Sequence, residues 1–123
     1  MKLRICDDSI RLRLLRGEVR ALREDGRVTR STRFSGLQKL VYSIECCDLP
    51  SVSASFVDGR MRVSVPTNQV AAWACGDEVS IRASQALPGG DSLLILVEKD
   101  FACLDRDEEA NADAFPNPQM QCR

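Results

Sequence analysis

Apolar and polar residues alternate along several short stretches of the chain, and this period of two predicts β-strands. Four stretches predict two hairpins: residues 2–6 with 10–14, and residues 52–57 with 61–65. Asp58-Gly59 separates the second pair and favours a type I′ turn, because glycine tolerates a positive φ. Asp7-Asp8 takes the matching place in the first pair and predicts a weaker turn.

After each hairpin the period changes to that of a short amphipathic helix. The apolar stripes are Leu15, Val19 and Leu22 in the first helix, and Val70 and Trp73 in the second. Gly26 and Gly76 follow these stripes and predict the helix ends. Two more strands follow each helix: residues 28–34 with 39–46, and residues 78–85 with 92–98. Each half of the chain is therefore predicted to have the order ββαββ.

The two halves also match residue by residue, which indicates an internal duplication. A shift of 51 residues places Val19 on Val70, Leu22 on Trp73 and Val28 on Val79. With two residues added at Pro88-Gly89-Gly90, the match extends to Ile44 on Val97 and Glu45 on Glu98. We therefore expect one domain over residues 1–98, built from repeats 1–47 and 52–98 with a linker at 48–51. Residues 99–123 are expected to form an acidic, proline-containing tail that is partly disordered.

The second half contains a motif that resembles a known fold family. Residues 57–66 read VDGRMRVSVP, and residues 76–81 read GDEVSI. A Gly-Arg turn, a strand ending in proline, a short helix and Gly-Asp-x-Val-x-Ile resemble the swapped-hairpin proteins AbrB, MazE and MraZ. The resemblance implies a mostly β, α+β fold, a pseudo-twofold barrel in which two ββαββ units interlace. A double-psi-like barrel, which is also built from a duplicated unit, is the alternative.

The first half departs from the motif of the family. It has Asp8-Ser9 where the second half has Gly59-Arg60, and Leu15 where the second half has Pro66. The two halves are therefore not expected to bind a ligand in the same way.

Charge is distributed unevenly, although the net charge is only −1. Residues 1–50 carry eleven Lys/Arg and seven Asp/Glu. Arg16, Arg20 and Arg23 recur at spacings of four and three and form one stripe of the first helix. Arg27 begins the strand that follows, and the resemblance implies that Arg60, at the Gly-Arg turn, contacts DNA. We predict these five arginines as nucleic-acid-binding residues; the alternative is a solvated face, partly neutralised by Glu18 and Glu24.

Several classes of chemistry lack the residues they need. The chain has no histidine, no P-loop and no G-x-G-x-x-G motif, so we expect no enzyme activity, cofactor or metal. No export signal or membrane-spanning stretch is found, and we expect a cytoplasmic protein. Its six cysteines are then expected to be reduced thiols: Cys6, Cys46, Cys47, Cys75, Cys103 and Cys122.

Two functional hypotheses follow, both for a non-enzymatic binding protein. The first is a DNA-binding regulator of the swapped-hairpin class. The alternative is a protein-interaction or antitoxin-like module that binds no nucleic acid. We expect either a monomer, which is already a pseudo-dimer, or a homodimer.

Overall fold

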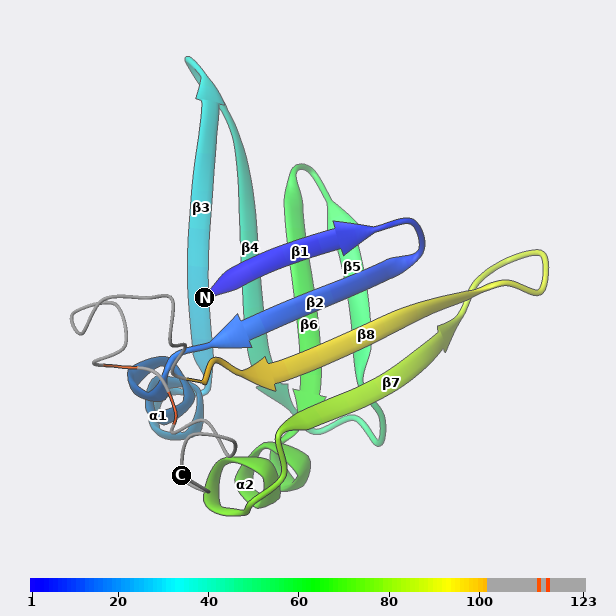
Figure 1. The fold of residues 1–123 in the computed structure, drawn as a ribbon. Helices are drawn as coiled ribbons and strands as arrows, with labels where there is room; N and C mark the ends of the chain where they lie inside the picture. The colour runs from blue at the N-terminus through cyan, green and yellow to red at the C-terminus, as the bar shows by residue number, and fades with distance from the viewer. Residues whose placement is uncertain (102–112, 114, 116–123) are drawn as a thin grey trace.

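The computed structural model describes residues 1–101, 113 and 115, which form eight named strands and two short helices (Figure 1). The first half consists of β1 (Lys2–Cys6), β2 (Ser9–Leu14), α1 (Arg16–Asp25), β3 (Arg27–Ser35) and β4 (Gln38–Cys47). The second half consists of β5 (Ser53–Val57), β6 (Arg60–Pro66), α2 (Thr67–Cys75), β7 (Ser80–Ala86) and β8 (Ser92–Lys99). The predicted order ββαββ is confirmed in both halves.

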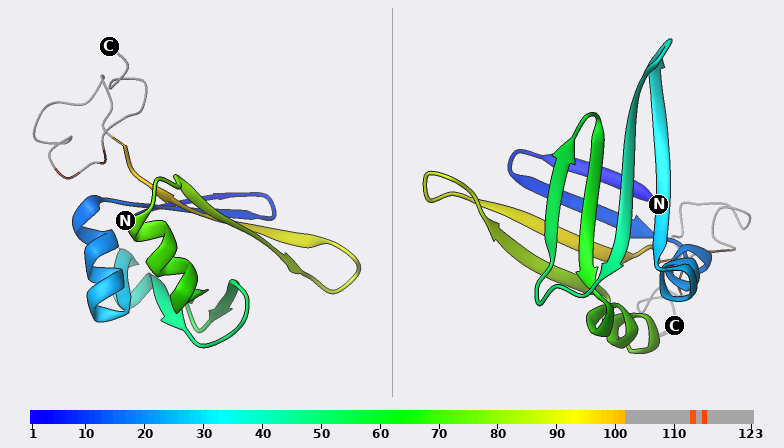
Figure 2. Two further views of the ribbon diagram at one scale, coloured as in Figure 1. Left: turned by 90° about the horizontal axis from the view of Figure 1, so that it is seen from below. Right: turned by 180° about the vertical axis from the view of Figure 1, so that it is seen from behind.

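Each of the two four-stranded sheets combines one hairpin from each half. Sheet A has the order β1-β2-β8-β7, and sheet B has the order β3-β4-β6-β5. The two hairpins of each half thus lie in different sheets, and we call this arrangement the exchange of hairpins. Within a sheet the hairpins of the two halves join through a parallel pair, β2 with β8 and β4 with β6, whereas the other neighbours are antiparallel. The sheets lie face to face, and the two helices lie side by side at one end of the sandwich (Figure 2).

The closed barrel that the sequence predicted is not formed. The described strands belong to two separate sheets, so neither the swapped-hairpin nor the double-psi-like prediction of a continuous barrel is correct. A side chain bridges one open seam, between the edge strands β5 and β7. The N–H of Ala54 donates to Oε1 of Gln85 at 2.7 Å, and Nε2 of Gln85 donates to the carbonyl of Ala54 at 3.0 Å. In a closed barrel, backbone hydrogen bonds between β5 and β7 would take the place of this side-chain bridge.

The strand register shows that the halves are related by a pseudo-twofold axis. Ile10 lies opposite Ile95 in sheet A, and the equivalent Met61 lies opposite Tyr42 in sheet B. Near the start of β8, the N–H of Leu94 donates to the carbonyl of Asp8 in the β1–β2 turn at 2.9 Å. Near the start of β4, the N–H of Val41 donates to the carbonyl of Gly59 in the β5–β6 turn at 3.0 Å. The two inner hairpin strands therefore occupy equivalent environments.

The structure corrects the position of the two-residue offset between the halves. Val28 and Ile81 take equivalent places in the β3–β4 and β7–β8 ladders. Both are buried, whereas Val79 is 40% exposed. The extra residues therefore lie in the connection between α2 and β7, and not at Pro88-Gly89-Gly90. The sequence match of Val28 with Val79 was wrong because an exposed valine in a connection resembles a core valine in sequence.

The core lies between the sheets and under the helices. Its fully buried members come from both halves: Leu12, Leu14, Leu22, Ile44, Val63, Val65, Val70, Trp73, Ile95 and Val97. Burial of each large apolar side chain contributes about 1.5–3 kcal/mol to folding. Since each sheet takes one hairpin from each half, neither half holds a complete core of its own.

The described residues of the predicted tail, 99–101, 113 and 115, dock on the domain. Phe101 and Phe115 form a β-bridge, and the N–H of Phe115 donates to the carbonyl of Asp100 at 2.7 Å. The predicted disorder and the thiols of Cys103 and Cys122 fall on residues outside the described part. Neither α1, with ten residues, nor α2, with nine, has the length and apolar content of a membrane-spanning helix.

Candidate functional site

The five arginines predicted from the sequence lie on three different surfaces. Arg16, Arg20 and Arg23 follow one exposed side of α1 and line a groove between α1 and α2. Arg27 begins β3 and Arg60 begins β6, both in sheet B. The structure therefore brings together the three helix arginines, here called the arginine stripe, but not all five residues.

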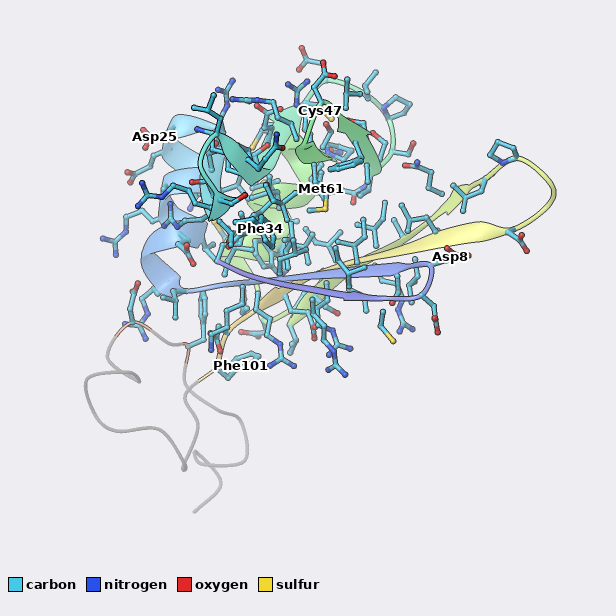
Figure 3. All side chains as sticks on the ribbon, turned by 90° about the horizontal axis from the view of Figure 1, so that it is seen from above. Asp8, Asp25, Phe34, Cys47, Met61 and Phe101 are labelled. Carbon is cyan, nitrogen blue, oxygen red and sulfur yellow. The ribbon has the colours of Figure 1, made fainter. Side chains whose placement is uncertain are left out.

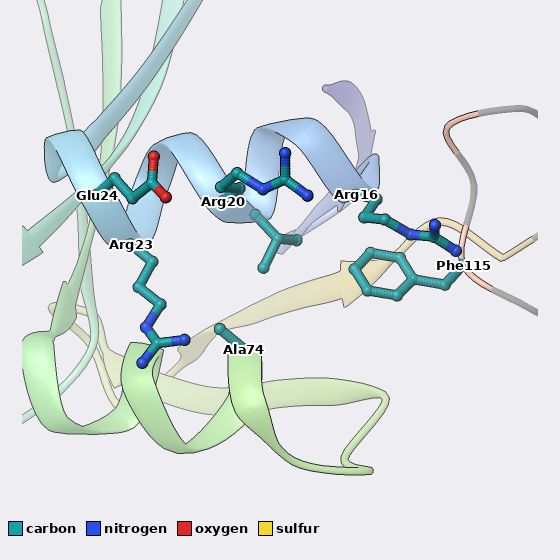
Figure 4. Close-up of a pocket in the computed structure, with 7 residues that line it drawn as sticks. Arg16, Arg20, Arg23, Glu24, Ala74 and Phe115 are labelled. Atoms are coloured by element: carbon teal, nitrogen blue, oxygen red, sulfur yellow. The ribbon is translucent and has the colours of Figure 1, made fainter.

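The groove between the helices has a volume of about 500 Å³. The described residues that line it are the arginine stripe, Val19, Glu24, Ala74 and Phe115. Figure 4 shows Arg23 reaching toward α2 beside Ala74, and Arg16 lying beside Phe115. Among the described residues, no carboxylate lies within ion-pair distance of the three guanidinium groups of the stripe.

The N-terminal end of α1 is held by carboxylates, because Leu15 at the capping position has no polar side chain. Oε1 of Glu18 accepts the N–H of Leu15 at 2.9 Å. Asp113 accepts the N–H of Arg16 with its carbonyl at 2.8 Å and the N–H of Gly17 with Oδ1 at 2.9 Å. The positive end of the helix dipole therefore already binds an anionic side chain from the distant C-terminal segment.

Glu18 does not neutralise the arginine stripe. Its side chain is buried, and Oε2 lies 2.8 Å from Nη2 of Arg30 and also contacts the α-amino group of Met1. Glu24 is the carboxylate that lines the groove itself. The neutralisation expected from the sequence is therefore limited to one of the two glutamates.

Phe115 is fixed at the end of the groove by a buried lysine. Nζ of Lys99 lies 5.2 Å from the ring centroid of Phe115 and 5.9 Å from that of Trp73, within the range of cation–π attraction. The same ammonium donates to the carbonyl of Gly76 at 2.9 Å. The aromatic wall of the groove is thus attached to the core through Lys99.

The two sheet B arginines differ in their surroundings. Nε of Arg27 lies 2.7 Å from one oxygen of Glu45, and Nε of Arg62 lies 2.8 Å from the other. Arg60 is exposed and lines a hollow of about 420 Å³ together with Arg30 and Lys39. Arg27 is therefore partly neutralised, whereas Arg60 belongs to a separate cationic surface.

The β1–β2 hairpin carries a basic surface that the sequence analysis missed. Lys2 lies opposite Arg13, and Arg4 lies opposite Arg11. Because side chains alternate along a strand and Leu12 is fully buried, these four cations lie on the outer face of sheet A. Figure 3 shows nitrogen-tipped side chains of sheet A extending away from sheet B.

Arg82 of β7 extends this surface across the sheet. Leu96 of β8 lies opposite Arg11 of β2 on one side and opposite Arg82 of β7 on the other. The three residues therefore form one row across the sheet, with side chains on the same face. We name Lys2, Arg4, Arg11, Arg13 and Arg82 the basic face of sheet A. The sequence contains the signal for this face, because Lys or Arg alternates with apolar residues in Lys-Leu-Arg-Ile and Arg-Leu-Arg-Leu. The prediction of the strands relied on the apolar residues of this alternation and not on the basic ones.

Counter-ions cover only part of the basic face of sheet A. Nε of Arg11 lies 2.8 Å from Oε1 of Glu98, and Nζ of Lys2 lies 3.6 Å from Oδ2 of Asp100. Among residues 1–101, 113 and 115, no carboxylate forms an ion pair with Arg4 or Arg13. These two arginines line a hollow of about 240 Å³ with their cationic neighbours. The face therefore keeps a positive charge.

Comparison with known proteins identifies the family but no relative of known role. The model of a family of unknown function, DUF7009, matches residues 1–119. The chain belongs to this family. Searches of curated proteins and of solved structures give no significant match.

In this DUF7009 protein the described residues include four cysteines. They contain no group of three or more side chains placed to hold a metal ion. Cys6, Cys46, Cys47 and Cys75 are free thiols. Burial raises the pKa of Cys46, and the neighbouring Cys47 raises it further. A raised pKa keeps Cys46 protonated and a poor nucleophile.

Proposed function

We propose that this DUF7009 protein binds duplex nucleic acid, without catalysis, through the basic face of sheet A. The cross-strand cation pairs Lys2–Arg13 and Arg4–Arg11 carry the proposal. Like charges directly opposite each other destabilise a sheet. A phosphate backbone offsets that cost and attracts Lys and Arg by releasing its counter-ions.

The shape of the basic face favours a duplex over a single strand. Sheet A is four strands wide, and its β1–β2 hairpin presents four cations on one face, so this face can meet phosphates of both strands of a duplex. Aromatic residues make up only 5% of the chain, which argues against a stacking platform for unpaired bases.

The exchange of hairpins between the halves supports a relation to the swapped-hairpin proteins, and we extend the proposal to that class. Arg60 then serves as the turn contact predicted from the resemblance. Arg27, paired with Glu45, contributes less than Arg60. The arginine stripe is assigned separately below.

Protein interaction is the second candidate function, and exposed apolar side chains favour it. Phe34 is 72% exposed and Leu37 is 98% exposed. Both lie at the end of the β3–β4 hairpin, which projects beyond the rest of sheet B (Figure 1). A protein partner that buries this tip would be isolated with the chain in a fixed stoichiometry and without nucleic acid.

The nucleic-acid proposal is tested by fluorescence anisotropy with a duplex of about 20 base pairs at several salt concentrations. We expect binding that weakens steeply between about 50 and 200 mM salt. The double variant Arg4→Ala/Arg13→Ala should weaken binding and lower the slope of log K against log salt by about two.

The matched control is Arg16→Ala/Arg20→Ala, which removes two exposed cations from α1, outside the basic face of sheet A and the surface around Arg60. It should leave the salt slope closer to that of the natural chain. Equal losses in the two double variants would show that only net charge matters. Absence of binding at about 50 mM salt would contradict the proposal outright.

A further inference from the structure

We propose that the groove between α1 and α2 binds one small organic phosphate, of the nucleoside di- or triphosphate class. This site is independent of the basic face of sheet A. It rests on a difference between two helices that the pseudo-twofold axis makes equivalent.

The two helices keep the same core positions but differ along the groove. Val19 and its equivalent Val70 are both buried. The residues equivalent to the arginine stripe on α2 are Thr67, Ala71 and Ala74. Arg23 and its own equivalent Ala74 both line the groove. The groove therefore lies where the axis relates the helices, with long cationic side chains on one wall and a small side chain on the other.

This difference creates the space for a ligand. Arginines at the same positions of both helices would repel each other and fill the groove. With Ala74 on the α2 wall, a volume of about 500 Å³ remains. That volume lies within the range of about 300–1,000 Å³ that is typical of small-molecule sites.

The electrostatics of the groove favour an anion. Cations spaced by three or four residues on a helix repel each other. Among the described lining residues Glu24 is the one carboxylate, so within this part of the chain three guanidinium groups share the groove with a single negative charge. A ligand with two or more negative charges removes this imbalance.

The chemistry of the lining distinguishes an organic phosphate from a simple ion. Guanidinium groups bind phosphate oxygens through paired N–H donors. Val19, Ala74 and Phe115 provide an apolar surface beside the arginine stripe. A flat ring attached to a phosphate chain uses both surfaces, whereas inorganic phosphate uses only the first.

Isothermal titration calorimetry on the full chain tests the site with ATP, GTP, adenosine, pyrophosphate and inorganic phosphate as probes. We expect one nucleotide per chain, weaker binding of pyrophosphate, and no binding of adenosine. Arg20→Ala should weaken nucleotide binding about tenfold or more, the loss expected for one charged hydrogen-bonding group. The exposed Arg33→Ala is the matched control and should not change the affinity.

Ala74→Arg gives a second test, because it places a charge of the stripe on α2 as well and should abolish nucleotide binding. If that variant fails to fold, Arg16→Ala/Arg20→Ala serves instead, since both side chains are exposed. Arg4→Ala/Arg13→Ala should bind nucleotide normally, which separates this site from the basic face of sheet A.

Three results would overturn the site: no saturable binding of any probe, equal affinities for the natural chain and Arg20→Ala, or phosphate and pyrophosphate binding as well as ATP.

Discussion

Leu22 of α1 and Trp73 of α2 occupy equivalent positions, and both are fully buried. The indole Nε1 of Trp73 donates to the carbonyl of Val79 at 3.1 Å, so the larger side chain also holds the longer connection that follows α2. Where a side chain packs in the core, the two halves have kept an apolar residue. Where it reaches solvent, as at Arg20 and Ala71, they have diverged. Single residues thus separate the shared core from the surfaces that can carry function.

Ile81 and Val79 provide a test of the corrected match between the halves. Ile81→Ala should lower the free energy of unfolding by about 2–5 kcal/mol, because it removes a buried side chain. Val79→Ala should change the free energy of unfolding by about 0.5 kcal/mol or less, since Val79 is 40% exposed and lies outside the core. Urea denaturation of both variants measures the difference. A larger loss of unfolding free energy for Val79→Ala than for Ile81→Ala would contradict the corrected match. The two extra residues would then lie at the Pro88-Gly89-Gly90 turn.

Asp113 links the C-terminal segment to the first turn of α1. Asp113→Ala should destabilise the protein by about 0.5–2 kcal/mol, as the loss of other helix-capping side chains does. Asp113→Asn keeps an oxygen acceptor for the N–H of Gly17 and should lose less. Thermal unfolding of the two variants checks this order. No change in either variant would mean that the segment is not docked in solution.

At the scale of the element, periodicity predicted most of the secondary structure because each strand and helix buries one face. It did not predict which sheet edges stay open or how the edge strands β5 and β7 are joined. The bridge between Gln85 and Ala54 joins residues 31 positions apart and depends on where the sheets cross. The basic face of sheet A depends on the register that places Arg4 opposite Arg11. The groove likewise depends on two helices meeting at the axis, which only the assembled structure shows.

Gln85→Ala tests the bridged seam between β5 and β7. We expect faster hydrogen exchange at the amide of Ala54, because that N–H loses its only described acceptor. Amides of the parallel β4–β6 pair should keep their protection, and they serve as an internal control. Unchanged exchange at Ala54 would show that the side-chain bridge does not hold the seam.

At the scale of the whole molecule, the exchange of hairpins determines how the sheets and the core are assembled. The core contains residues of both halves, whereas only some of the charged residues follow the pseudo-twofold symmetry. The ion pair of Arg11 with Glu98 has its equivalent in that of Arg62 with Glu45. Lys2, Arg4 and Arg13 correspond instead to Ser53, Ser55 and Ser64. A duplicated framework therefore presents one basic sheet face and one arginine-lined groove rather than two copies of each.

Separated halves should not fold as monomers. Cleavage in the exposed connection at residues 48–51 leaves each half without the hairpin that completes its sheets. We expect each fragment alone to lack a cooperative unfolding transition, and an equimolar mixture to regain one. Circular dichroism with sedimentation velocity measures both properties. A folded monomeric half would show that its core is complete without the other.

The most direct measurement of the central claim is a set of backbone NOEs in the intact protein. The exchanged arrangement predicts contacts of Ile10 with Ile95 and of Met61 with Tyr42 across the two parallel strand pairs. Contacts of β2 with β4, and of β6 with β8, would instead place each hairpin in the sheet of its own half. That result would contradict the exchange, and with it the basic face and the groove as described.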